Sequence, residues 1–141
     1  MELPLRLLVA AIVAGLTIPT IVSGLSVYEA HEVSARAIRA IEAVVLVAQQ
    51  FYLSGGGAED VRVDLEGGVT AKVEYVVIGD APDGPRAPTA RFKVSGQPEV
   101  FVLSDPPVPM AGEGGPLRVG PGRHTVRVAY DGGGPVRLAV V

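Results

Sequence analysis

The side chains that could do chemistry in this sequence are two histidines and several carboxylates, and their spacing matches no common reactive site. His31 and His124 lie far apart, and the segment HEVSA that starts at His31 lacks the second histidine that a zinc-binding helix carries four residues later. The chain has no cysteine, which excludes a disulfide, a thiolate metal site and a thiol nucleophile. We therefore expect no metal, no cofactor and no enzymatic activity.

Three further polar segments are typical of turns and solvated surface. Asp80 and Asp83 in the segment GDAPDG could hold calcium weakly, but Asp and Gly are also the usual residues of turns. The glycine-rich segment 112–122 lacks the lysine and the hydroxyl of a phosphate-binding loop, so we predict an ordinary loop. Glu59 and Asp60 are adjacent and have no apolar setting that would suit acid–base chemistry. We expect both to be solvated.

The charge pattern argues against a nucleic-acid partner. The formal net charge is −3, no run of lysine and arginine is present, and only 5 % of the residues are aromatic. Neither a phosphate backbone nor stacked bases would find a suitable surface. Five arginines share the polar register of the predicted strands with Asp64 and Glu74, which predicts an exposed surface of mixed charge. These arginines are Arg62, Arg91, Arg118, Arg127 and Arg137.

The composition also bears on the source of the chain. It contains no asparagine, no cysteine and only three glutamines. Depletion of these thermolabile residues is typical of proteins from hot environments. A genome rich in G and C would favour the same bias, so both explanations stay open.

The helices and strands that must position these side chains differ on the two sides of SGGGAED, residues 54–60. Before this boundary, residues 5–22 are apolar on all sides, and as a helix they would extend roughly 27 Å, near the thickness of a bilayer core. Residues 25–53 follow without a polar break and form an amphipathic pattern. We therefore predict one helix over 1–54, kinked near Pro19, followed by a globular head over 55–141.

The amphipathic part of the helix carries its apolar residues at alternating steps of three and four from Val27 onwards, with charged residues mostly on other faces. We expect this stripe to pack on the head. The residues predicted to make the helix-to-head contact are Ile38, Ile41, Val45, Ala48 and Tyr52.

The second part of the chain alternates apolar and polar side chains in short runs separated by Gly and Pro, a pattern typical of half-buried antiparallel strands. The predicted strands are 61–65, 70–77, 90–94, 99–104, 116–119, 125–130 and 136–140. The fourth is apolar enough to lie in the core. Six or seven such strands indicate a small antiparallel β-sandwich or open barrel, and the whole chain is predicted to be α+β.

The apolar segment allows three interpretations. A cleaved secretory signal is disfavoured because Glu2 precedes the only basic residue, Arg6, and the helical pattern runs past any plausible cut. A single-pass anchor with a β-sandwich ectodomain that binds a ligand or partner protein explains the hydrophobicity. It leaves unexplained the amphipathic extension rich in small residues, which let helices approach closely. A helix that leaves the bilayer and packs against copies of itself explains both features.

This layout resembles the type IV pilin superfamily, in particular archaeal pilins and archaellins. The resemblance rests on the apolar helix 5–22 with Pro19, the amphipathic continuation to Tyr52, the glycine boundary and the strands that follow. It implies a structural subunit whose helices bundle into a filament core while the heads form the outer sheath, on the surface of an archaeal cell. Family members lose a short basic leader; none is visible ahead of the apolar segment, so we expect either that Met1 is already the mature end or that this member differs.

The partner implied by the resemblance is the chain itself, in a helical homopolymer, with the membrane as its host before assembly. The implied assembly interface is the apolar surface of the helix. Its residues are Leu5, Leu7, Leu8, Val9, Ile12, Val13, Leu16, Ile18, Pro19, Ile21 and Val22.

Overall fold

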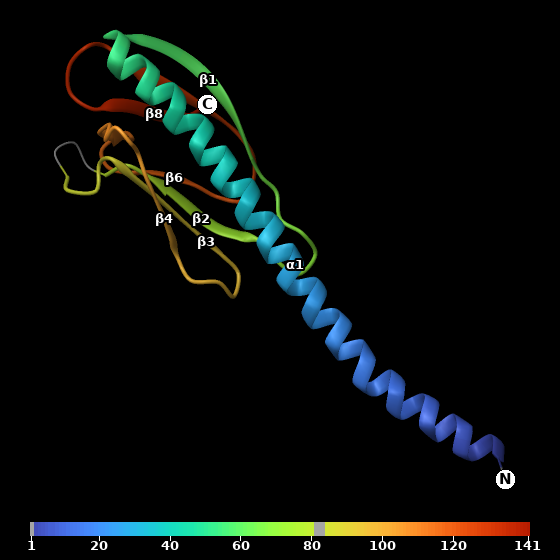
Figure 1. Cartoon of the computed structure of the whole chain (residues 1–141). Coiled ribbons are helices and arrows are strands. Elements are labelled where there is room, and N and C mark those ends of the chain that lie inside the picture. The colour runs from blue at the N-terminus through green and yellow to red at the C-terminus, as the bar shows by residue number, and fades with distance from the viewer. Residues whose placement is uncertain (1, 81–83) are drawn as a thin grey trace.

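The protein consists of one long helix that carries a β-rich head along its C-terminal half (Figure 1). The computed structural model describes residues 2–80 and 84–141, without the side chains of residues 2, 3 and 22. Helix α1 spans Glu2–Ser54, and its 53 residues extend roughly 80 Å. The N-terminal half of α1 projects away from the head, which gives the molecule the shape of a head on a stalk.

Helix α1 continues through Pro19 as a single α-helix. The proline ring removes one backbone donor, and Figure 1 shows a gentle curve in the projecting part where a kink was predicted. The hydroxyl of Thr20 donates to the carbonyl of Leu16 at 3.0 Å. The helix ends at Ser54, and the next residue, Gly55, has a positive φ of 92° that turns the chain while its N–H donates to the carbonyl of Phe51 at 2.9 Å.

The head is built from two four-stranded sheets, so the predicted α+β class is confirmed. In one sheet the strand order is β1-β7-β8-β5, and in the other it is β4-β3-β2-β6. All pairings within these sheets are antiparallel except that of β5 with β8. The strands are β1 (Gly57–Leu65), β2 (Val73–Ile78), β3 (Thr89–Val94), β4 (Val100–Leu103), β5 (Met110–Ala111), β6 (Leu117–Val119), β7 (Gly122–Tyr130) and β8 (Val136–Val140).

Several predicted strand boundaries were wrong, and non-local pairing explains the differences. The described part of the chain has eight strands, because the segment 104–116, predicted as loop, contains β5. Strands β1 and β7 pair over nine residues, from Gly57 opposite Tyr130 to Leu65 opposite Gly122, and this ladder extends both into stretches predicted as turns. Residues 70–72, predicted as strand, precede β2 and are not part of it.

The segment 99–104 was predicted to lie in the core, and this holds for one face of it only, because Val100 and Val102 pack against the core while the side chains between them do not. It forms β4, which lies at the edge of its sheet. Phe101 is 53 % exposed and Leu103 is 72 % exposed. An apolar run indicates a strand but does not say whether a neighbour covers its outer face, because that depends on the strand order.

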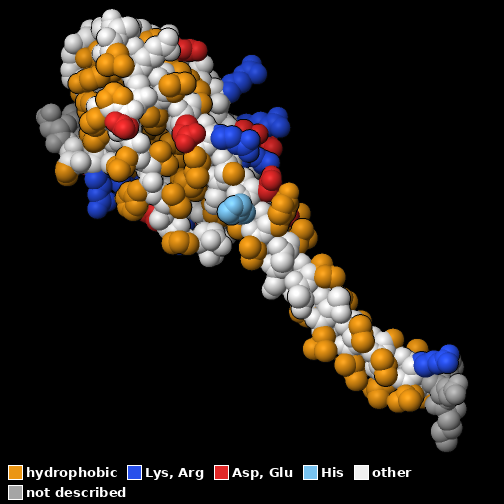
Figure 2. Space-filling view, viewed as in Figure 1, with side chains coloured by type: hydrophobic (Ala, Val, Ile, Leu, Met, Phe, Trp, Pro, Cys, Tyr) orange, Lys and Arg blue, Asp and Glu red, His pale blue; other side chains and the backbone are white. Residues whose placement is uncertain are grey.

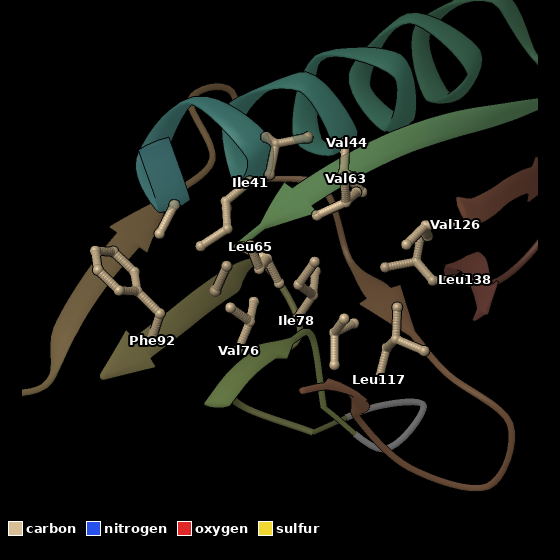
Figure 3. Close-up of a cluster of buried hydrophobic side chains, with 14 of the residues drawn as sticks. Ile41, Val44, Val63, Leu65, Val76, Ile78, Phe92, Leu117, Val126 and Leu138 are labelled. Carbon is tan, nitrogen blue, oxygen red and sulfur yellow. The ribbon is translucent and has the colours of Figure 1, made fainter. Parts of the chain in front are cut away.

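The hydrophobic core is shared by the helix and both sheets. Helix α1 contacts β1 and β7 of one sheet and β2 and β3 of the other. Figure 3 shows Ile41 and Val44 pointing from the helix into the space between the sheets. The C-terminal half of α1 is therefore a structural part of the head, while the N-terminal half is not.

Candidate assembly interface

The projecting part of α1 exposes apolar side chains on all its faces. Every described side chain from residue 4 to residue 21 is exposed, including Pro19. The large apolar ones are each 52–70 % exposed, and they are Leu5, Leu7, Leu8, Val9, Ile12, Val13, Leu16, Ile18 and Ile21. The side chain of Val22, also predicted for this interface, lies outside the described residues. An apolar surface of this extent is far more than an isolated soluble protein normally leaves in water.

The projecting helix has the dimensions of a membrane-spanning segment. Among the described residues it is the one helix long and apolar enough to cross a bilayer, and its most apolar window has a mean hydropathy of 2.2 with none of it buried. No charged residue occurs between Arg6 and Glu29. Those intervening residues span roughly 33 Å, which is close to the hydrocarbon thickness of a bilayer. A membrane anchor or a signal sequence would have the same length and composition.

The apolar stripe of the helix meets the head at Ala30, its first buried residue. Val27, with which the predicted stripe begins, is exposed because it lies on the projecting part. Beyond this point the helix changes from a uniformly exposed surface to one with a buried face and a solvated face.

The residues predicted to link the helix to the head lie at this buried face or next to it. Ile41, Val45 and Ala48 are buried in the shared core, and Ile38 is partly buried against it. Tyr52 is 37 % exposed, and its ring centroid lies 5.3 Å from that of Tyr130 on β7 at an interplanar angle of 44°. The tilted ring pair covers the end of the core where the helix stops.

A carboxylate fastens the head to the helix at the point where the helix leaves it. Glu29 Oε2 accepts hydrogen bonds from the backbone N–H of Thr70, at 2.7 Å, and from the Thr70 hydroxyl. The Thr70 hydroxyl, followed by its N–H, holds the pKa of Glu29 below its usual value. Two turns further along, Arg36 donates to the carbonyl of Glu66 at 3.1 Å.

Sequence reasoning missed the contact between Glu29 and Thr70. Glu29 is one of several charged residues of the amphipathic helix, and nothing in its local spacing distinguishes it from the others. Thr70 lies 41 residues away in a stretch that was predicted as strand. The contact depends on how the 66–72 connection folds back on the helix, which local patterns do not reveal.

The described residues among the two histidines and the carboxylates of the segment GDAPDG are located as follows. His124 Nε2 lies 3.0 Å from the carbonyl of Gly120, and it is near the start of β7. His31 is exposed on the helix. Asp80 Oδ2 accepts a hydrogen bond from the backbone N–H of Arg86 at 3.4 Å. Asp83, its predicted companion, lies outside the described residues.

The adjacent carboxylates Glu59 and Asp60 are both exposed, as expected. Asp60 also pairs with Arg127 across the β1–β7 ladder, with Arg127 Nε 2.8 Å from Asp60 Oδ1. This hydrogen bond lowers the pKa of Asp60 and raises that of Arg127. Cross-strand neighbours were not visible in the sequence, so the partner could not be assigned.

The outer surface of the head carries both signs of charge, as predicted. Besides the Asp60–Arg127 pair, the described part of the head places an arginine or lysine within 4 Å of a glutamate in the pairs that follow. These are Arg91–Glu99 at 3.9 Å, Lys93–Glu74 at 3.4 Å and Arg123–Glu66 at 3.1 Å. The Tyr75 hydroxyl also donates to Glu99, and this bond raises the pKa of Tyr75.

Comparison of the chain with protein-family models, with curated proteins and with solved structures gave no match. The resemblance to the pilins therefore stays a prediction. The candidate site is defined by physical features alone: the projecting half of α1 is exposed and apolar on all sides, and it continues without a flexible linker into the half that shares the core of the head.

Proposed function

We propose that this chain is a structural subunit that polymerises through α1 into an extracellular, pilus-like filament, as the layout of type IV pilins implies. One observation carries the proposal: a helix apolar on all its faces projects from the head with every described side chain between residues 4 and 21 exposed. Before assembly the helix lies in a membrane, and during assembly it moves into an equally apolar environment between copies of itself.

The burial available to such an assembly is sufficient for a stable fibre. Full burial of a Leu, Ile or Val side chain contributes roughly 1.5–3 kcal/mol. The nine large side chains of the projecting part retain half or more of their surface for this purpose. Their burial amounts to something on the order of 10 kcal/mol before the entropic cost of association is subtracted. A contact that joins two different faces of the helix yields a helical polymer when the rotation between neighbouring copies does not close a ring.

Two exposed leucines lie on the half of α1 that packs on the head, and they favour other copies of the chain over a membrane as the surface that finally covers the helix. Leu46 is 65 % exposed and Leu53 is exposed as well, on the side of the helix that faces away from the core. Leu46 lies thirty residues beyond Leu16 along the helix, a distance of roughly 45 Å. A bilayer centred on the apolar segment reaches only about 15 Å from its midplane. A neighbouring subunit in a helical bundle can cover both leucines.

The depletion of asparagine, glutamine and cysteine supports a heat-adapted source. Together with the archaellin-like layout, it leads us to place the filament on the surface of an archaeal cell from a hot environment. The head surface, with its mixed charges, would face the surroundings of the cell.

The proposal is tested by removing detergent from the purified full-length chain and looking for fibres by sedimentation and negative-stain electron microscopy. We expect fibres of uniform diameter from the parent chain. Ile12→Asp places a carboxylate in the middle of the apolar surface and should leave the chain in the supernatant, since a desolvated charge is costly there. Val69→Asp makes the same change at an 89 % exposed position on the head and should leave assembly intact.

Circular dichroism of each variant in detergent serves as the control for folding of the head. Recovery of the parent chain only as monomers in vesicles would refute the filament and support the alternative, a single-pass membrane-anchored β-sandwich that binds a ligand or partner protein. Equal fibre yields from the parent and Ile12→Asp would refute the helix as the interface.

A further inference from the structure

The two sheets of the head have four edge strands, and three of them are protected. Strands β5 and β6 comprise only two and three residues. Strand β1 packs against α1. It also carries charged side chains at alternate positions, among them Asp60, Arg62 and Asp64. Short length, charge and coverage by a helix are the usual means by which proteins prevent edge strands from pairing with other chains.

Strand β4 is also short, at four residues, but it lacks the other two protections, charge and coverage by a helix. Its sequence VFVL contains neither a charge nor a proline, and within the described residues it pairs with β3 only. Phe101 lies opposite Arg91 and Leu103 opposite Thr89, so both side chains project from the outer face of the sheet. Both are more than half exposed. A bare apolar edge of this kind favours association with another chain.

The backbone of β4 is also oriented for further contact. Ser104 N–H donates to the carbonyl of Pro88 at 3.2 Å, which continues the ladder beyond the last residue of β4. Backbone groups alternate in direction along an antiparallel strand, so those of Val100 and Val102 face β3. The N–H and C=O groups of Phe101 and Leu103 therefore face the open edge of the sheet.

We propose that β4 is a contact between heads in the assembled filament, where a second copy of this chain covers Phe101, Leu103 and the open edge. The inference rests on the proposed function and adds a second, separate interface to it. A bilayer around the apolar segment is too far from β4 to cover Phe101 and Leu103. The Gln49 side-chain amide donates to the carbonyl of Pro106, just beyond β4, at 3.3 Å. Gln49 lies roughly 50 Å along the helix from Leu16, at the middle of the apolar segment.

Continuity supports a second copy as the occupant. Figure 2 shows hydrophobic side chains continuing from the projecting helix over the head, so subunits that bundle through α1 are brought together beside a further apolar surface. In a helical polymer every copy presents the same edge to the same neighbour, so even a small contact is repeated along the fibre. A monomeric head would have no use for an uncharged apolar edge.

Thiol labelling tests the proposal cleanly because the chain contains no cysteine of its own. Leu103→Cys places a reporter on β4, and Val69→Cys places a matched reporter on an exposed loop elsewhere on the head. Each variant is treated with a maleimide reagent as detergent-dispersed monomers and as fibres. We expect labelling at position 103 to be lost in the fibres, and labelling at position 69 to be the same in both states.

A charge substitution gives an independent measurement. Leu103→Lys should raise the protein concentration needed for fibres by about tenfold or more, because the ammonium group must be desolvated at the contact. Val69→Lys should not change it. Fibres in which position 103 labels as fast as in monomers would overturn this inference and leave the proposed function standing. Absence of fibres from the parent chain would overturn both.

Discussion

The shared core predicts that a substitution in the helix destabilises the β-rich head. Ile41 is 1 % exposed and lies in the helix face that packs between the two sheets. Ile41→Ala removes three carbon groups, and at about 0.8 kcal/mol for each buried group the transfer cost is roughly 2.4 kcal/mol. The cavity that remains adds to this cost, so we expect a loss of about 2–5 kcal/mol in the free energy of unfolding.

Denaturant unfolding of the full chain in detergent measures this loss, with near-ultraviolet circular dichroism of the tyrosines as the signal. Tyr52 and Tyr130 form the ring pair between the helix and β7, so the signal reports on the junction itself. Leu46→Ala is the matched control, because it truncates an exposed side chain five residues further along the same helix. Its effect should stay within about 0.5 kcal/mol. If both variants unfold at the denaturant concentration of the parent, the helix is not part of the core.

Two further predictions concern the connections of the head. The lowered pKa of Glu29 means that its hydrogen bonds to Thr70 stabilise the fold above the usual pKa of 4.5 and are lost as the pH falls below it. Glu29→Gln should therefore lower the denaturant concentration at the unfolding midpoint at neutral pH, and the difference from the parent should vanish in acid. Glu42→Gln, on the exposed face of the same helix, is the control. It should leave the pH dependence of the parent unchanged. Gly79 has a φ of 78°, and a Cβ there would lie 2.1 Å from a backbone carbonyl oxygen of β5. Gly79→Ala should therefore destabilise the head by about 1–3 kcal/mol or more in the same denaturant assay. Gly96→Ala separates backbone strain from the steric clash, because Gly96 has a similar φ of 72° but open space around it. An equal loss of stability in both variants would contradict the clash at Gly79.

Parts of the fold that depend on local periodicity were predictable. The stripe that includes Ala37, Ile41, Val44 and Ala48 repeats at helical spacing, and the structure buries all four. The uniformly apolar segment before it was also visible as a helix with no polar face, and Gly55 marked the end of the helix. Hydrophobic spacing and a helix-ending glycine are properties of neighbouring residues, so the sequence reveals them directly.

Features that depend on distant partners were not predictable. The two residues of β5 form a strand only because Met110 lies beside Val136 of β8. Asp60 finds its arginine on the strand that begins 62 positions later. Phe101 and Leu103 looked like core residues, and they are exposed because they project from the outer face of the edge strand β4, while Val100 and Val102 face the core.

The sequence by itself determined that this chain has a long helix with an apolar half, a head rich in strands, and no thiol chemistry, because composition and periodicity act within a few residues. The tertiary structure decided which half of the helix the head buries, where Glu29 fastens the two together, and which sheet edge stays open. These depend on strand order and on how the connections fold back, and both are set by contacts between residues far apart in the chain. The bare edge at β4 is the clearest case, since the strand order alone decides which strand of a sheet lies at its edge.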